Sequence, residues 1–375
     1  MTVIAACLSV LVVPMAHGDA PRSPKPKPTS GPFRVETVAR GLVNPWGLAF
    51  LPDGRMLVTE RPGRLRVVAR DGTLSAPVAG VPRVLAEGQG GLLDVALDPR
   101  FADNRFVYLS YSEPGPRGSA GTAVARGRLG DNQLEDVRVI YQQEPKVDSG
   151  RHYGSRLVFA RDGTLFVTQG DRGNHSEKAQ DLSSGIGKIM RINPDGSAPR
   201  DNPFAGRSGV PPQLWSYGHR NVQAAALHPE TGQLWTVEHG ARGGDELNRP
   251  ERGKNYGWPV ISYGVNYSGT KIGEGTAKAG MEQPLYYWDP VIAPSGMVFY
   301  TGDAYPDWKG SVLIGSLSPG LLVRLVLADG KVTREERYAG DLGQRIRDVR
   351  QGPDGLVYVL TDQSSGRLLR LVPAR

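Results

Sequence analysis

Alternating hydrophobic and polar positions recur along this chain in short segments, each introduced by a turn. A Pro-Asp-Gly turn or a relative of it is followed by a few β-branched, aromatic or aliphatic residues that alternate with polar ones. An Asp-Gly turn between apolar segments is a strong signal for a β-hairpin. No segment after residue 30 has the period of a long amphipathic helix. The pattern therefore predicts an all-β protein.

This turn-strand phrase occurs six times. The copies are LPDGRMLVTE (51–60), DPRFADNRFVYLSY (98–111), RDGTLFVTQGD (161–171), HPETGQLWTVEHG (228–240), GDAYPDWKGSVLIGSL (302–317) and GPDGLVYVLTD (352–362). Their average spacing is about fifty residues, which suits a four-stranded propeller blade with some enlarged loops. We therefore expect a six-bladed β-propeller of four-stranded antiparallel blades. A β-sandwich or two small β domains is the alternative, but neither repeats one phrase so regularly.

The N-terminus has a different pattern. The apolar run Val3–Val13 ends at Pro14, and small residues of a cleavage site end at Gly18. This pattern indicates a secretory signal peptide, although no Lys or Arg precedes the apolar run. The predicted signal peptide, Pro-rich linker and propeller domain cover residues 1–18, 19–31 and 32–375. We therefore expect a periplasmic or secreted protein.

Cys7 is the only cysteine and lies inside the predicted signal peptide. The segment Ile4–Cys7 faintly resembles a lipoprotein box, but the apolar residues that continue after it favour cleavage over lipidation. The mature chain would then have no cysteine, and so neither disulfides nor thiol chemistry.

Composition and charge narrow the possible partners. The 375 residues are 39% hydrophobic and 22% charged, and the 49 glycines and 30 prolines suit many short strands joined by turns. The formal net charge is +7, but Lys and Arg are scattered along the chain, so we expect no nucleic-acid partner. The N-terminal apolar run is too short for a stable membrane span, and none is predicted.

Polar segments too long for ordinary blade turns separate the repeats. Long structured loops on a rigid scaffold commonly carry function. These segments are 145–156, 171–191, 215–223, 238–258 and 340–348.

His152 and Asp171 lie in two of these segments. His152 precedes a predicted strand, and Asp171 follows the strand that pairs with it in a hairpin. In an antiparallel hairpin both residues lie at the same end, and an imidazole oriented by a carboxylate is a general-base arrangement. A histidine near a strand end is more often structural, so this pair alone leaves both interpretations open.

Three further segments carry polar chemistry. Arg220 beside Asn221 suits an anionic or carbonyl-rich ligand, or else a hydrogen-bonding loop between blades. The glycines and carboxylates of 238–246 suit an oxygen-only site for a hard cation such as Ca²⁺, and the zinc-type spacing of His and Cys is missing. Arg345 and Arg347 are two apart in a predicted strand, so they point to one face and match carboxylates, unless that face is simply exposed.

Several of these phrases together resemble the soluble quinoprotein glucose and aldose sugar dehydrogenases, the glucose/sorbosone dehydrogenase family. The phrases are NPWGLAFLPDG, GQGGLLDVALDP, YGHRN, EHG…GDE with GKNYGWP after it, and RIRDV. The resemblance runs from about Asn44 to Leu371. It implies a six-bladed propeller that holds pyrroloquinoline quinone (PQQ) and Ca²⁺ at one end of its channel. The implied activity is oxidation of an aldose at the anomeric carbon to a lactone, with electrons passed to an external acceptor.

The resemblance also implies roles for individual residues. His152 would be the general base for the anomeric hydroxyl, Asp171 would orient its ring, and Arg220 would stabilise charge as hydride arrives. The backbone carbonyls of Gly240 and Ala241 would ligate Ca²⁺. The residues implied in cofactor binding are Gln89, Arg220, Asn221, Arg345, Arg347 and Trp288, the last beside the ring or the sugar entrance.

One turn departs from the family pattern. Glucose-specific members carry a lysine before the glycine of a Leu-x-x-Gly turn, whereas residues 317–320 read LSPG. This favours the broader aldose branch, and the short loops also favour a monomer or weak dimer.

Two other functions stay open. A Ca²⁺-dependent propeller hydrolase of the lactonase type would need several acidic side chains facing its metal. A non-catalytic glycan-binding propeller would leave the pair of His152 and Asp171, and the arginine pair, without a role.

Overall fold

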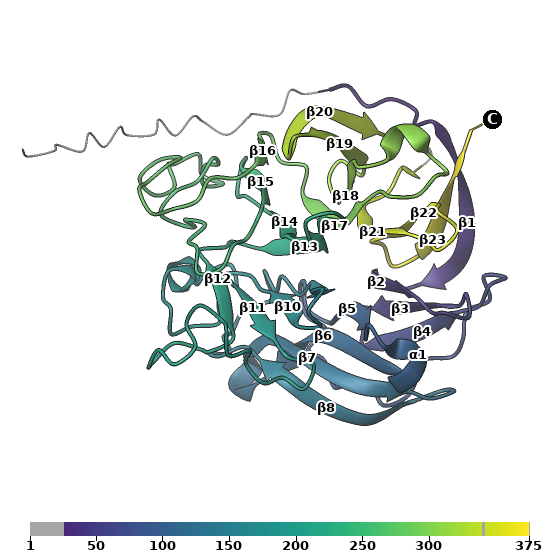
Figure 1. Ribbon diagram of the computed structural model, residues 1–375, viewed down its shortest axis with the longest axis horizontal. Helices are drawn as coiled ribbons and strands as arrows, with labels where there is room; N and C mark the ends of the chain where they lie inside the picture. The colour runs from purple at the N-terminus through teal and green to yellow at the C-terminus, as the bar shows by residue number, and fades with distance from the viewer. Residues whose placement is uncertain (1–25, 340–341, 375) are drawn as a thin grey trace, which may run out of the picture.

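The computed structural model describes residues 26–339 and 342–374. The predicted signal peptide with Cys7, and the linker up to residue 25, lie outside the described residues. Across the described ranges six antiparallel sheets surround a common centre (Figure 1), which confirms the six-bladed propeller. No helix in these ranges is both long and apolar enough to cross a membrane.

Each blade starts with its strand nearest the centre. Blades I to III contain β2 (Pro45–Phe50), β3 (Met56–Glu60) and β4 (Arg64–Val68); β5 (Leu92–Leu97), β6 (Phe106–Pro114), β7 (Ala120–Leu129) and β8 (Leu134–Gln142); and β9 (Leu157–Phe159), β10 (Leu165–Thr168), β11 (Lys188–Ile192) and β12 (Leu214–Tyr217). Blades IV to VI contain β13 (Val222–Leu227), β14 (Leu234–Glu238), β15 (Asp245–Asn248) and β16 (Tyr286–Trp288); β17 (Pro294–Phe299), β18 (Val312–Ser316), β19 (Leu322–Ala328) and β20 (Lys331–Tyr338); and β21 (Ile346–Gln351), β22 (Val357–Thr361), β23 (Gly366–Pro373) and β1 (Phe33–Leu42). The helical segments are single turns: α1 (Phe101–Asn104), η1 (Pro116–Gly118), η2 (Ser176–Ala179) and η3 (Pro306–Trp308).

The turn-strand phrase marks the same position in every blade. Each copy leads into the second strand, which is β3, β6, β10, β14, β18 or β22. Blade I has three regular strands, and isolated pairings of Leu65 with Val78 and Val68 with Leu74 stand in place of a fourth.

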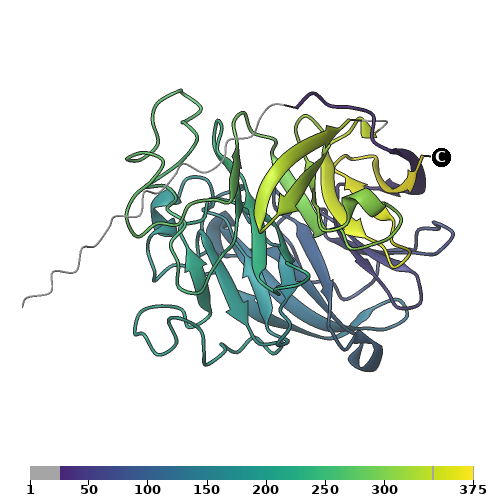
Figure 2. The same ribbon diagram turned by 45° about the horizontal axis from the view of Figure 1, so that its top comes forward.

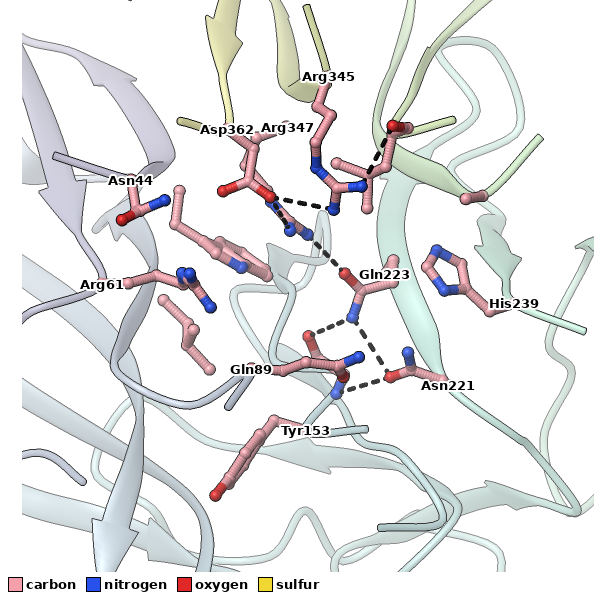
Figure 3. A pocket seen from close by; sticks show the side chains of 15 residues that line it. Asn44, Arg61, Gln89, Tyr153, Asn221, Gln223, His239, Arg345, Arg347 and Asp362 are labelled. Carbon is pink, nitrogen blue, oxygen red and sulfur yellow. Dashed lines mark hydrogen bonds and ion pairs between the residues drawn. The ribbon is translucent and has the colours of Figure 1, made fainter. Parts of the chain in front are cut away.

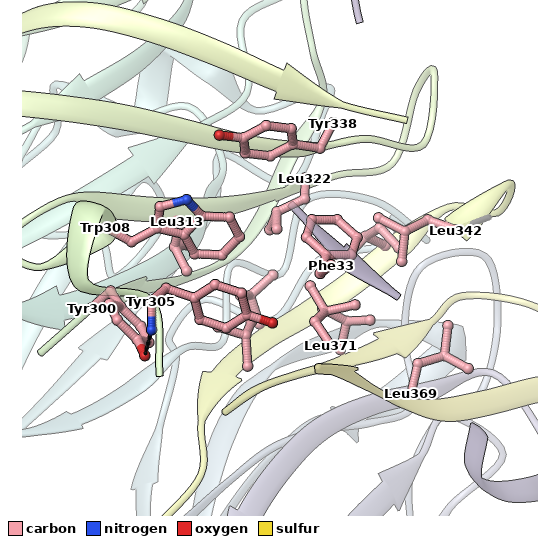
Figure 4. Packing of buried hydrophobic residues seen from close by; sticks show 14 residues of the cluster. Phe33, Tyr300, Tyr305, Trp308, Leu313, Leu322, Tyr338, Leu342, Leu369 and Leu371 are labelled. Carbon is pink, nitrogen blue, oxygen red and sulfur yellow. Dashed lines mark hydrogen bonds between the residues drawn. The ribbon is translucent and has the colours of Figure 1, made fainter. Parts of the chain in front are cut away.

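The first and last described strands close the ring in blade VI. Strand β1 pairs antiparallel with β23, so that Phe33 lies opposite Pro373. Figure 4 shows the packing at this closure, where the Phe33 ring meets Trp308 and Tyr338 edge-on at 6.0 and 5.9 Å. Thr29, in the segment predicted as linker, pairs with Tyr338 and is therefore already attached to the propeller.

Neighbouring blades are joined near the centre by buried hydroxyl groups. Ser110 Oγ donates to the carbonyl of Ser155 at 2.6 Å, and Thr168 Oγ1 donates to the carbonyl of Val222 at 3.0 Å. Each bond runs from one blade to the first strand of the next, or to the segment that leads into it. These bonds satisfy backbone groups that no ladder serves, and they fix the blades relative to one another.

Five of the six first strands, all except β9, have a register shift near the end where they begin. The shifts fall at residues 45–48, 92–95, 222–224, 294–297 and 346–348, in β2, β5, β13, β17 and β21. A β-bulge leaves a residue outside the ladder and re-aims its side chain. Trp46, Leu93, Gln223 and Arg347 lie within these shifts, and all four line the central cavity.

One long loop also reaches the centre. The segment between β15 and β16 projects from the edge of the molecule as the green loop in Figures 1 and 2. Near its start Trp258 turns inward, and its indole Nε1 donates to Asp171 at 2.8 Å.

Candidate active site

A cavity of about 310 Å³ occupies the end of the channel where the first strands begin. This volume is at the lower end of the range for small-molecule sites, roughly 300–1,000 Å³. All six blades or their leading segments contribute to its lining (Figure 3). The lining residues are Asn44, Trp46, Arg61, Gln89, Leu93, Tyr153, Gly154, Asn221, Gln223, His239, Ala293, Leu317, Arg345, Arg347 and Asp362.

One wall of the cavity is rich in guanidinium groups. Arg347 Nη2 lies 2.6 Å and Arg345 Nη2 3.3 Å from the same Asp362 oxygen, so the predicted arginine pair faces one side. Arg61 adds a third guanidinium, and among the described lining residues Asp362 is the one carboxylate. Burial alone would raise the pKa of Asp362, but Arg347, Arg61 and Arg345 hold that pKa well below its usual range. The wall therefore carries net positive charge.

Several polar atoms of this wall have no partner among the residues that the structure describes. They are Nε of Arg61, Nε of Arg347 and Oδ1 of Asp362, all buried. A buried polar group without a partner is uncommon and calls for an explanation, such as a missing ligand. Three guanidiniums with spare donors suit a ligand bearing carboxylates.

The opposite side carries His152 and Asp171, which the structure brings together. His152 Nδ1 lies 2.6 Å from Asp171 Oδ1, and the two side chains are 11% and 1% exposed. Asp171 Oδ1 also accepts the Gly173 amide at 2.7 Å, and its Oδ2 accepts the Trp258 indole. The carboxylate is therefore held from three directions, and Nε2 is the ring nitrogen of His152 left for a ligand.

The backbone at His152 is strained. Its φ is +51°, in the left-handed region that few residues with a side chain adopt. The His152 carbonyl packs against Gly170, where a Cβ would lie only 2.2 Å from it. The amide of His152 donates to Gln89 Oε1 at 2.8 Å, which links the histidine to a cavity-lining residue. His152 itself borders the cavity through its neighbours Tyr153 and Gly154.

The surroundings favour the neutral form of His152 by lowering its pKa. Burial lowers its pKa, and the charges of Arg220 and Arg151 add to this effect, while Asp171 opposes it. For Asp171, burial alone would raise the pKa, but the hydrogen bond from His152 and the charge of Arg220 outweigh it and lower the pKa. A neutral imidazole beside an ionised carboxylate is ready to accept a proton.

Asn221 lines the cavity, and Arg220 lies beside it without being part of the lining. The Gly154 amide and Gln223 Nε2 both donate to Asn221 Oδ1 at 3.2 Å, which leaves the Asn221 amide nitrogen to donate. Arg220 Nη1 donates to the carbonyls of Gly240 and, at 3.1 Å, His239, and its Nε has no partner in the described part of the chain.

The loop that carries Gly240 and Ala241 lies beside Arg220. Asp245 holds it: Oδ1 accepts the Gly240 amide at 2.8 Å, and Oδ2 accepts the amides of Ile292 and Ala293. Among the described residues no three His, Cys, Asp or Glu side chains gather as a metal site. A cation at this loop would therefore rely on backbone oxygens, and at Gly240 it would share the oxygen with Arg220.

Trp288 does not reach the cavity. Its side chain is 0% exposed and packs between blades IV and V, with its ring 5.2 Å from that of Tyr286. An indole buried in this core cannot stack on a ligand in the channel, so we do not assign Trp288 to the site.

Other residues were missed by the sequence prediction. Trp46, Gln223 and Asp362 line the cavity, and Trp258 holds Asp171. Trp46 and Trp258 lie in phrases that carry the family resemblance, and Asp362 ends the last copy of the repeat. The turn at residues 317–320 departs from the family pattern because it lacks a lysine. Leu317 of this turn lines the cavity, and its carbonyl accepts a hydrogen bond from Arg345 at 3.3 Å. Arg345 therefore brings positive charge to this turn.

Comparison with known proteins identifies the family of the chain. The family model for glucose/sorbosone dehydrogenases matches residues 42–370. The chain is 50% identical over 344 residues to the aldose sugar dehydrogenase YliI of Escherichia coli (strain K12), covering 90% of this chain and 92% of the relative. The apo-form crystal structure of the soluble aldose sugar dehydrogenase from Escherichia coli superposes with a TM-score of 0.89 at 50% identity, covering 91% and 100% of the two chains. A PQQ-bound aldose sugar dehydrogenase from Streptomyces coelicolor gives 0.76 at 29% identity, covering 92% and 99%. The chain belongs to the glucose/sorbosone dehydrogenase family.

Proposed function

We propose that the protein is a PQQ- and Ca²⁺-dependent dehydrogenase that oxidises aldoses at the anomeric carbon to lactones and passes the electrons to an external acceptor. The observation that carries this proposal is the buried pair of His152 and Asp171 at the edge of an arginine-lined cavity. The relation to an aldose sugar dehydrogenase supports the choice of substrate.

The cavity fits the cofactor by the chemistry of its donors. PQQ is a flat aromatic tricarboxylate with two quinone oxygens, and the guanidiniums of Arg61, Arg345 and Arg347 offer donors for its carboxylates. Gln89, which holds the His152 amide, would contact the polar edge of the cofactor.

His152 would take the proton of the anomeric hydroxyl at Nε2. Asp171 fixes the other ring nitrogen, so the free lone pair has one direction. Because burial lowers the pKa of His152, the ring stays neutral at pH values where a free histidine is partly protonated.

A bound quinone would supply the acceptor for the hydride of the anomeric carbon. Loss of that hydride, together with loss of the hydroxyl proton to His152, would convert the lactol to a lactone. Arg220 and the Asn221 amide would donate to oxygens that gain negative charge in this step. Calcium would bind the carbonyls of Gly240 and Ala241, which are hard oxygen donors, and would polarise the same oxygens.

Reconstitution tests the proposal. We expect the protein incubated with PQQ and Ca²⁺ to reduce an artificial electron-accepting dye when an aldose is added. If neither dye reduction nor a change in quinone absorbance occurs with any aldose, the proposal is wrong. Three guanidiniums against one carboxylate in the lining favour this function over a lactonase, which would need an acidic metal site.

A further inference from the structure

A cluster of four charged side chains lies next to the cavity, and two of them, Asp94 and Asp348, directly follow the lining residues Leu93 and Arg347 in β5 and β21. Its members are Asp94, Arg156, Asp348 and Arg350. Arg156 Nη1 lies 3.0 Å from both aspartates, Arg350 Nε lies 3.0 Å from Asp348, and Arg350 Nη2 lies 3.2 Å from Asp94. Arg156 and both aspartates are at most 1% exposed. Two guanidiniums balance two carboxylates, so the cluster has no net formal charge.

Arg156 contacts two residues that line the cavity. Its guanidinium carbon lies 4.3 Å from the centre of the Trp46 ring, and its Nε donates to the Gln223 carbonyl at 3.1 Å. Within residues 26–339 and 342–374 its Nη2 has no hydrogen-bond partner. A guanidinium over an indole face is a favourable cation–π contact, strongest where water is excluded.

Strand pairing does little to fix the orientation of the Trp46 side chain. Trp46 lies inside the register shift of β2, so its side chain depends on its neighbours for orientation. Those neighbours are Arg156 and the apolar side chains of Leu93 and Tyr153. Arg347, which is predicted to bind the cofactor, lies 5.7 Å from the same ring.

We propose that Arg156 is a positioning residue for the cofactor: it holds the Trp46 ring in place as the cavity surface against which the flat cofactor packs. The inference rests on the proposed function. Since the cluster is charge-balanced, Arg156 acts through geometry and not by attracting the anionic cofactor from a distance.

A double-mutant cycle on cofactor affinity tests this role. The variants are Arg156→Lys, Trp46→Leu and the double variant, and the readout is the Kd for PQQ with Ca²⁺, measured by equilibrium dialysis and quinone absorbance. Lysine keeps the charge but lacks the planar fork that meets both aspartates and the ring. We expect each single variant to raise the Kd about tenfold, and the double variant to be little worse than Trp46→Leu alone.

The matched control is Arg126→Lys. Arg126 lies 4.4 Å over the Phe106 ring in blade II, away from the cavity, and donates to the Pro194 carbonyl. We expect this variant to keep the wild-type Kd. Additive losses in the cycle would show that Arg156 does not act through Trp46. An unchanged Kd with a lowered Tm would show that Arg156 is only structural. Either result overturns the inference.

A second variant decides the case where Arg156→Lys fails to fold. Trp46→Phe keeps an aromatic face, so we expect it to retain most of the affinity that Trp46→Leu loses; equal Kd values for the two would contradict the proposal. If the wild-type protein itself binds no PQQ, the proposed function fails. If the wild type binds and the variants match it, only the role of Arg156 fails.

Discussion

The side of the cavity with His152, the histidine wall, and the side with the arginines, the arginine wall, each contain one carboxylate. The two carboxylates differ in how many of their oxygens accept hydrogen bonds. Asp171 is engaged through both oxygens, by the His152 ring, the Gly173 amide and the Trp258 indole. Asp362 shares one oxygen between two arginines, and its other oxygen has no partner among the described side chains and backbone. The carboxylate beside His152 is fully engaged without a ligand, whereas the arginine side has donors to spare. We infer that the histidine wall performs the proton transfer and the arginine wall binds the cofactor.

The strongest test of this division is His152→Ala. Removal of a general base typically costs about 10²- to 10⁴-fold in rate, so we expect turnover to fall at least about a hundredfold. The Kd for PQQ should stay within about twofold, because His152 only borders the cavity. Steady-state kinetics and dialysis measure the two quantities on the same preparation. An equal loss of cofactor affinity would show that proton transfer and cofactor binding are not divided between the two walls.

The converse test is Arg347→Gln. Hydrogen bonds to charged groups contribute about 1.5–3 kcal/mol each, so we expect the Kd for PQQ to rise about ten- to a hundredfold. Turnover at saturating PQQ should change much less, since the arginine wall lies apart from the proton acceptor. Titration of the variant with PQQ under assay conditions gives both values. A large loss of turnover at saturation would assign Arg347 to the chemical step.

Asp171→Asn sharpens the comparison through pH. Burial places the pKa of His152 below its ordinary value, so the acidic limb of kcat/KM should fall below about pH 6.5. Asp171 raises this pKa, so its replacement should lower the pKa further and move the limb to lower pH. Turnover should also fall about tenfold, because the ring is no longer oriented. A limb that moves to higher pH, or stays in place, would contradict the assigned pair.

The smallest expected change is the shift in Tm when calcium binds. If Ca²⁺ binds the loop of Gly240 and Ala241, adding it to chelator-treated protein should raise the Tm by a few degrees at concentrations well above its Kd. The same addition should strengthen PQQ binding, while Mg²⁺, which prefers smaller octahedral sites, should do less. Differential scanning calorimetry with each ion makes the comparison. Equal shifts with both ions would argue against a specific calcium site.

The sequence predicted those parts of the molecule that depend on local patterns. The repeated phrase located the second strand of every blade, and the contact between His152 and Asp171 follows from their places in one hairpin. Trp46 and Gln223 reach the cavity through bulges in different blades, and no local pattern shows which way a bulged side chain turns.

Trp288 illustrates the opposite error. Side chains two apart on a strand share a face, so Trp288 lies with Tyr286 in the core between blades IV and V. A prediction from residue type and nearby loops does not reveal that face until the strand pairing of β16 is known.

The closure of blade VI by β1 and β23 has a practical consequence. Because the first and last strands lie side by side, the natural ends of the domain come close together, and a short peptide could join them. New ends could then be opened in an exposed turn of another blade, such as the one before β10. Such circular permutants would allow an electron-accepting domain to be fused at a chosen place around the rim, with the six blades and their central cavity unchanged.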